Sequence, residues 1–168
     1  YAIASGLIDG DAFVDIITAT TLTNQLVWYK NNGDGTFTAQ SNITNTINFV
    51  GSILLVDLNN DTFFDLLVAA YSSNSVTWYA NDGAGNFGAQ QLIGTVNGAS
   101  GLAVGTIDAG STIDVAATSY DDNNVVWFSN SGTGTFGSAQ ILDNTLSAPG
   151  TLNLKDIDND GDLDALVS

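Results

Sequence analysis

The chain has 168 residues, of which 44% are hydrophobic, and its formal net charge is −16 at pH 7. This apolar content is enough for a folded core and too high for a disordered segment. All 18 acidic residues are Asp, and the cations are Lys30 and Lys155 alone, so the chain has too few positive charges to neutralise the phosphates of a nucleic acid. The same shortage argues against an anionic membrane surface, and no apolar run is long enough to span a bilayer.

A period of about 50 residues organises the chain. An aromatic pair beginning with Trp occurs at residues 28–29, 78–79 and 127–128, and each pair precedes a turn that begins with Asn and contains two glycines. Acidic loops end in Asp at 15, 65, 114 and 164, with the same spacing. Self-similarity at a fixed period indicates a repeat architecture. We therefore interpret residues 1–168 as a single domain with repeats 1–50, 51–100, 101–150 and a partial repeat 151–168.

The acidic loop of the first repeat, residues 7–15, is incomplete. Counted as positions 1 to 9, it has Leu7 at position 1 and carboxylates at positions 3, 5 and 9, which are Asp9, Asp11 and Asp15. Like charges this close repel one another unless a cation neutralises them. These three carboxylates are candidate metal ligands, although the sequence is also compatible with a loop that binds no metal.

The second repeat shows the full pattern of strands and turns. An apolar run at 52–56 enters the acidic loop, residues 65–71 leave it, and a β-branched and aromatic segment follows at 76–79. Asn81-Asp82-Gly83 is a hairpin signal, and residues 87–93 are expected to form a fourth strand. No window has sustained helical periodicity. Four short antiparallel strands in about 50 residues predict one blade of an all-β propeller.

The second and fourth acidic loops, residues 57–65 and 156–164, are complete. They carry oxygen-bearing side chains at positions 1, 3, 5 and 9, a pattern that suits a hard ion such as Ca²⁺. An EF-hand would require Glu at position 12 and flanking helices, whereas position 12 is Val68 or Val167. The third loop, residues 106–114, keeps only Asp108 and Asp114. We expect it to bind no metal and to be held by hydrogen bonds within the turn.

These loops, together with the turns after the Trp pairs, resemble the FG-GAP/VCBS repeats that form integrin-alpha-like β-propellers. The resemblance covers the whole chain and implies calcium in the hairpin between the first and second strands of a blade. The implied ligands are the side chains of Asp57, Asn59, Asp61 and Asp65 with the carbonyl of Phe63, and those of Asp156, Asp158, Asp160 and Asp164 with the carbonyl of Asp162. Three and a half blades do not close a ring. We expect the remainder of a ring of about seven blades, from the same polypeptide or another chain, to complete it.

The residue types favour a module without catalytic activity. The chain has no His, Cys, Glu or Arg, which leaves few groups for acid–base or nucleophilic chemistry. We expect one aromatic residue of each Trp pair to pack between blades, because consecutive strand residues face opposite sides. The expected function is a secreted or cell-surface, calcium-binding propeller that binds a protein or glycan ligand, since some propellers of this family are lectins. The alternative is a scaffold segment of a larger secreted enzyme, such as a polysaccharide-acting hydrolase.

Overall fold

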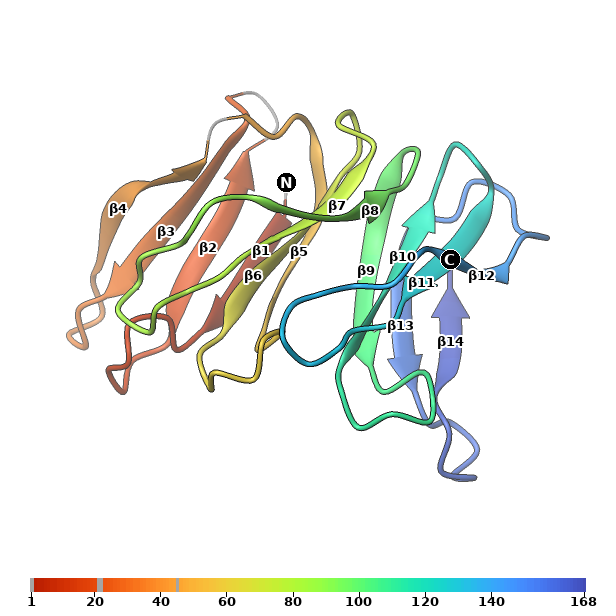
Figure 1. Ribbon diagram of the computed structural model, residues 1–168. Coiled ribbons are helices and arrows are strands. Elements are labelled where there is room, and N and C mark those ends of the chain that lie inside the picture. Colours follow the sequence, from red (N-terminus) through yellow and green to blue (C-terminus); the bar gives the residue numbers. More distant parts are fainter. Residues whose placement is uncertain (1, 21–22, 45) are drawn as a thin grey trace.

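The computed structural model describes residues 2–20, 23–44 and 46–168, and in it four antiparallel sheets lie side by side (Figure 1). The first sheet contains β1 (Ala2–Gly6), β2 (Asp15–Thr20), β3 (Gln25–Asn31) and β4 (Phe37–Thr44). The second contains β5 (Val50–Val56), β6 (Asp65–Ala70), β7 (Ser75–Tyr79) and β8 (Gln91–Thr95). The third contains β9 (Ala99–Gly105), β10 (Asp114–Ser119), β11 (Asn124–Phe128) and β12 (Gln140–Asp143), and the fourth contains β13 (Leu152–Lys155) and β14 (Asp164–Val167). The predicted all-β propeller, with three blades and half of a fourth, is confirmed.

Each blade is a simple meander in which consecutive strands pair in chain order. The first strands of successive blades, β1, β5, β9 and β13, lie next to one another. The last Asp of every acidic loop begins the second strand, where it pairs with the last residue of the first strand: Asp15 with Gly6, Asp65 with Val56, Asp114 with Gly105 and Asp164 with Lys155. All four acidic loops therefore extend from the same end of the blades, the lower end in Figure 1.

The hydrophobic core lies between blades rather than within them. One cluster joins the first blade to the second and contains Trp28 and Tyr79; the next joins the second blade to the third and contains Trp78 and Phe128. All six residues of β6 are buried, because the second blade has a neighbour on each face. Strand β2 instead alternates between buried and half-buried residues. The expectation that one aromatic residue of each pair packs between blades is confirmed for these pairs, and in the second blade both Trp78 and Tyr79 are buried.

Two turn glycines allow Trp28 and Trp78 to pack against the next blade. Gly85 lies against the indole ring of Trp28, and Gly134 lies against that of Trp78, so a Cβ at either glycine would overlap the ring. Both glycines also have positive φ, at 81° and 73°. A residue with a side chain would therefore be unfavourable at these positions in both backbone conformation and packing.

The fourth strand of the second blade is shorter than predicted. It begins at Gln91 rather than residue 87, and Phe87 forms only an isolated bridge to Asn81. The amide of Gly88 donates to the carbonyl of Ala80 at 2.8 Å, which closes the turn, and the chain leaves the ladder until Gln91. Among the described residues, no helix has the length and apolar character needed to cross a membrane.

Candidate functional site

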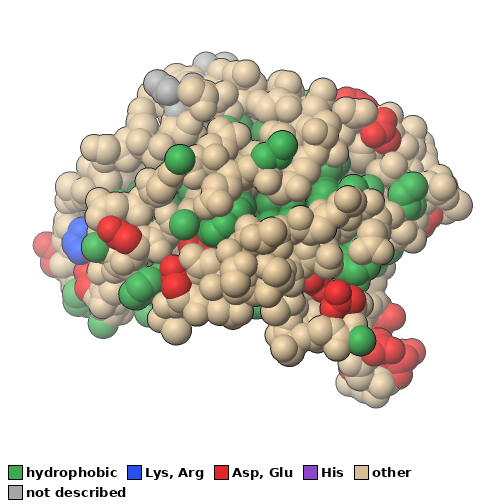
Figure 2. Space-filling view, in the orientation of Figure 1, with side chains coloured by type: hydrophobic (Ala, Val, Ile, Leu, Met, Phe, Trp, Pro, Cys, Tyr) green, Lys and Arg blue, Asp and Glu red, His purple; other side chains and the backbone are tan. Residues whose placement is uncertain are grey.

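The loop between β13 and β14 brings three predicted ligands together. One carboxylate oxygen each from Asp156, Asp158 and Asp164 lies within 4.8 Å of the other two. Calcium binds oxygen at about 2.3–2.6 Å, so two ligands of one ion lie up to about 5 Å apart. A single calcium ion could therefore contact all three oxygens. Figure 2 shows acidic side chains gathered at the tip of this loop, at the lower right of the molecule.

The second and fourth loops share one backbone conformation. Positions 4 and 6 have positive φ in both, at Asn60 (60°) and Thr62 (77°) and at Asn159 (63°) and Gly161 (99°). In both loops the position 1 carboxylate accepts a hydrogen bond from the position 6 amide, which is 2.8 Å from Asp57 to Thr62 and 3.1 Å from Asp156 to Gly161. The two loops therefore curl in the same way around their position 1 carboxylate.

The remaining predicted ligands orient the backbone of these loops. Asp61 and Asp160, at position 5, accept hydrogen bonds at 2.9 Å from the amides of the position 7 residues, Phe63 and Asp162. In the second loop the Asn59 amide group donates to Asp61 Oδ2 at 2.8 Å. This hydrogen bond between Asn59 and Asp61 has no counterpart among the contacts of Asp158 and Asp160, so the three-carboxylate cluster of the fourth loop is the clearer candidate for a metal centre.

Burial makes the charge on Asp65 costly. Desolvation raises the pKa of this carboxyl to about 6, with a smaller contribution from the neighbouring carboxylates of Asp61 and Asp57. Hydrogen bonds from the amides of Asn81 and Leu58, at 3.0 and 2.9 Å, oppose this effect. A cation bound in the loop would favour the charged form of Asp65.

The position 9 Asp also has a role that does not require a metal. Asp65 and Asp114 each accept a hydrogen bond from the position 2 amide of their own loop and another from the Asn that begins the next turn. Asp114 does so although its loop lacks carboxylates at positions 1 and 5. Asp108 of the same loop accepts from the Gly110 amide at 2.6 Å. The expectation that turn hydrogen bonds hold the third loop is therefore confirmed.

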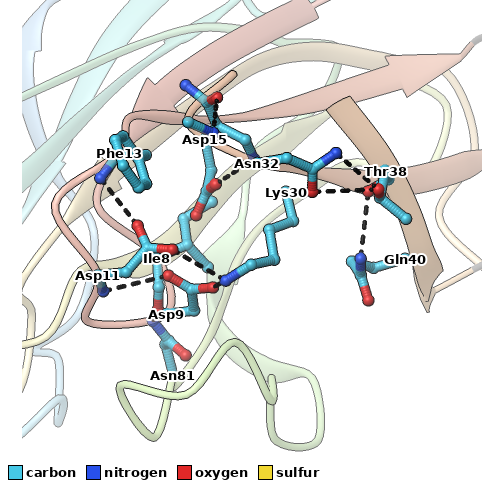
Figure 3. Close-up of polar contacts among 12 residues, drawn as sticks. Ile8, Asp9, Asp11, Phe13, Asp15, Lys30, Asn32, Thr38, Gln40 and Asn81 are labelled. Carbon is cyan, nitrogen blue, oxygen red and sulfur yellow. Dashed lines mark hydrogen bonds and ion pairs between the residues drawn. The ribbon is translucent and has the colours of Figure 1, made fainter. Parts of the chain in front are cut away.

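In the first loop a lysine contacts the predicted ligands. Lys30 Nζ pairs with Asp9 Oδ2, and it also pairs with Asp11 Oδ2 at 2.9 Å (Figure 3). These contacts raise the pKa of Lys30 and lower that of Asp11. Asp15 Oδ1 accepts from the Asn31 amide at 2.8 Å, while its buried Oδ2 has no hydrogen-bond partner within the described part of the chain. Asp9 and Asp11 thus converge on one cation, while Asp15 contacts the following turn.

The Asn that begins the turn of the second and of the third blade connects that blade to the preceding one, a role that the sequence interpretation missed. The side-chain amide of Asn81 donates to the carbonyl of Ile8 in the preceding acidic loop at 2.8 Å, and that of Asn130 donates to the carbonyl of Leu58 at 2.8 Å. Both side chains are buried. The recurrence of Asn at the first turn position was the available signal, because a hairpin alone does not require Asn there.

Comparison with known proteins identifies the family. A family model described as an FG-GAP-like repeat matches residues 8–68 and 111–167, which is more than half of the chain. The chain belongs to the FG-GAP-like repeat family. No curated protein matches it.

A solved structure supports the propeller architecture of this FG-GAP-like chain. A lectin from Agrocybe aegerita, whose structure concerns specific recognition of non-reducing terminal N-acetylglucosamine, matches with a TM-score of 0.67 and 18% sequence identity. The alignment covers 97% of this chain and 46% of the lectin chain. The chain thus spans less than half the length of this structural relative, and the likeness at this identity concerns the fold.

An open cavity also lies between the first and second of these FG-GAP-like blades. Its volume is about 190 Å³, and it is lined by Trp28, by Ser41, Asn42 and Ile43 of β4, and by Gly85, Asn86 and Phe87 of the following turn. Asn42 and Asn86 are exposed, so their amides are accessible to a ligand. The cavity combines aromatic surface with amide and hydroxyl groups, as ligand pockets commonly do.

Proposed function

We propose that the chain is a non-catalytic, calcium-binding segment of a β-propeller that presents a ligand-binding surface outside the cell. The observation that carries the calcium assignment is the convergence of Asp156, Asp158 and Asp164 within 4.8 Å. The matching backbone of the second loop supports a second ion. Oxygen-only ligands on exposed loops favour Ca²⁺ over transition metals, which prefer nitrogen or sulfur ligands.

The proposed role of the ion is structural. Each complete loop ends at the Asp that begins the second strand, and in the second blade this Asp65 also holds the amide of Asn81. Asn81 in turn donates to the preceding blade through Ile8. An ion at Asp65 would therefore stabilise both its own hairpin and the contact between two blades. Sites of this kind with millimolar affinity suit a secreted or cell-surface protein, where calcium is abundant.

Thermal denaturation tests the calcium assignment. An ion that binds only the folded state at 100 times its dissociation constant stabilises it by about 2.7 kcal/mol, which corresponds to an increase in Tm of about 5–11 °C for a domain of this size. Asp158→Ala should reduce this increase. Asp108→Ala is the matched control, because Asp108 occupies the same position in the third loop and makes a similar backbone hydrogen bond. Equal calcium responses in the wild type and Asp158→Ala would contradict the assignment.

We propose carbohydrate as the ligand class. The cavity beside Trp28 is smaller than the roughly 300–1,000 Å³ clefts that hold drug-sized ligands, and it is therefore suited to a single ring of a larger ligand. Its amide and hydroxyl groups can bond to sugar hydroxyls, and Trp28 supplies aromatic surface. The structural relative that recognises N-acetylglucosamine supports this proposal.

A glycan array with the wild type and an Asn42→Ala variant tests the ligand class. Asn42 is exposed, so its side chain can be removed with little effect on folding. We expect binding to a subset of glycans in the wild type and a marked loss in Asn42→Ala at an unchanged Tm. An array without signal for the wild type would exclude carbohydrate, and an unchanged signal for Asn42→Ala would exclude this cavity.

A further inference from the structure

We propose that Lys30 is a built-in cation that takes the place of a metal ion in the first acidic loop. The ammonium group lies between two carboxylates that occupy positions 3 and 5, the same positions that Asn59 and Asp61 occupy in the second loop (Figure 3). Its Nζ contacts one oxygen of Asp9 and one of Asp11, the latter at 2.9 Å. A lysine ammonium has three donors and can hold both carboxylates at once.

Comparison among the repeats supports this assignment. Lys30 directly precedes the Asn that begins the turn, and the equivalent residues are Ala80 in the second repeat and Ser129 in the third. The second loop is complete and has no lysine here, while the third has lost the position 5 carboxylate and has none either. The lysine is thus present in the repeat that keeps the carboxylates at positions 3 and 5 but has Leu7 at position 1.

The chemistry of the loop explains why Leu7 at position 1 and Lys30 before the turn occur in the same repeat. Calcium needs six to eight oxygen ligands, and replacing the position 1 carboxylate with Leu7 removes a ligand and a negative charge. Asp9 and Asp11 still repel each other, and a tethered ammonium relieves this repulsion without any ion from solution. The first loop would therefore keep its shape when calcium is removed, whereas the complete loops would not. Among the residues that the structure describes, Asp15 Oδ2 has no hydrogen-bond partner, which a bound ion would also explain, so a test must distinguish the Lys30 ammonium from a calcium ion.

Variants that convert one type of loop into the other distinguish Lys30 from a bound ion, because each conversion should change the number of calcium ions bound. The expected calcium stoichiometries rest on the proposed calcium function of the complete loops. In calorimetric titrations with Ca²⁺, we expect Leu7→Asp/Lys30→Ala to bind one ion more than the wild type, and Asp57→Leu/Ala80→Lys to bind one fewer. Asp9→Asn/Asp11→Asn should bind as many ions as the wild type. If this last variant binds one ion fewer, the first loop itself binds calcium and the proposal is wrong.

A second measurement tests Lys30 without reference to calcium binding. In excess chelator, Lys30→Met should lower the Tm by about 2–4 °C, because Asp9 and Asp11 lose their counter-charge. In the Asp9→Asn/Asp11→Asn background the same substitution should have little effect, since no repulsion remains. Equal effects of Lys30→Met in both backgrounds would overturn the proposal. If instead no variant binds calcium but these Tm shifts are observed, the proposed calcium function fails while the role of Lys30 stands.

Discussion

Replacement of Asn81 by Ala should weaken the contact between the first two blades at the end that carries the acidic loops. The Asn81 side chain is 2% exposed and donates to two carbonyls, that of Ile8 in the preceding blade at 2.8 Å and that of Phe64 at 3.2 Å. Ala would leave both acceptors without this donor. A buried acceptor without a partner costs about 1–3 kcal/mol, and the second bond is longer and only partly buried, so we expect a loss of about 2–4 kcal/mol in total.

Asn31→Ala is the matched control for Asn81→Ala. Asn31 begins the equivalent turn of the first blade, but among residues 2–20, 23–44 and 46–168 its side-chain amide donates only to the exposed carbonyl of Val14, at 3.0 Å. We expect this variant to lose about 0.5–1.5 kcal/mol. Circular dichroism melts should show a Tm decrease for Asn81→Ala of about 4–16 °C and a clearly smaller one for Asn31→Ala. Equal decreases in the two variants would refute the inference that Asn81 links the blades.

Three further predictions concern the turns and the second acidic loop. Gly85→Ala should destabilise the protein by about 1–3 kcal/mol more than Gly35→Ala. Both glycines have positive φ, but of the two only Gly85 lies against a side chain, the indole of Trp28. Similar chemical denaturation midpoints for the two variants would contradict this packing. Burial raises the pKa of Asp65 to about 6 from 3.8, so its contribution to calcium-free stability is fully present below pH ~4 and is lost as the pH rises through 6. In thermal melts with chelator, the Tm of the wild type should fall relative to that of Asp65→Asn as the pH rises from 4 to 7. A wild-type Tm that rises relative to that of Asp65→Asn over this range would contradict the prediction. Thr62→Gly should stabilise the protein by about 1 kcal/mol, since Thr62 has a φ of 77° that a β-branched residue rarely adopts. A lower denaturation midpoint for Thr62→Gly than for the wild type would show that the backbone at Thr62 is not strained.

The repeat period made most of the fold predictable from the sequence. The spacing of the Trp pairs and of the acidic loops places every blade, because each feature recurs at the same point in a four-stranded meander. The strand boundary at Gln91 was not predictable in the same way. Phe87 has strong β propensity, but the hydrogen bonds of the preceding turn fix its backbone in an isolated bridge before the chain leaves the ladder.

The candidate site was predictable only as far as it depends on residues close in sequence. The convergence of Asp156, Asp158 and Asp164 follows from their spacing within one loop. The contacts of Lys30 with Asp9 and of Asn81 with Ile8 join residues 21 and 73 positions apart. Such contacts depend on how strands and blades are placed in space, and a pattern read along one repeat does not contain that information.

Anomalous scattering from crystals grown in millimolar calcium tests the central claim most directly. We predict one peak in the loop at residues 57–65 and one at residues 156–164, each about 2.3–2.6 Å from its carboxylate oxygens, and none in the loop at residues 106–114. Loops without peaks at 57–65 and 156–164 under these conditions would contradict the claim that calcium stabilises this propeller.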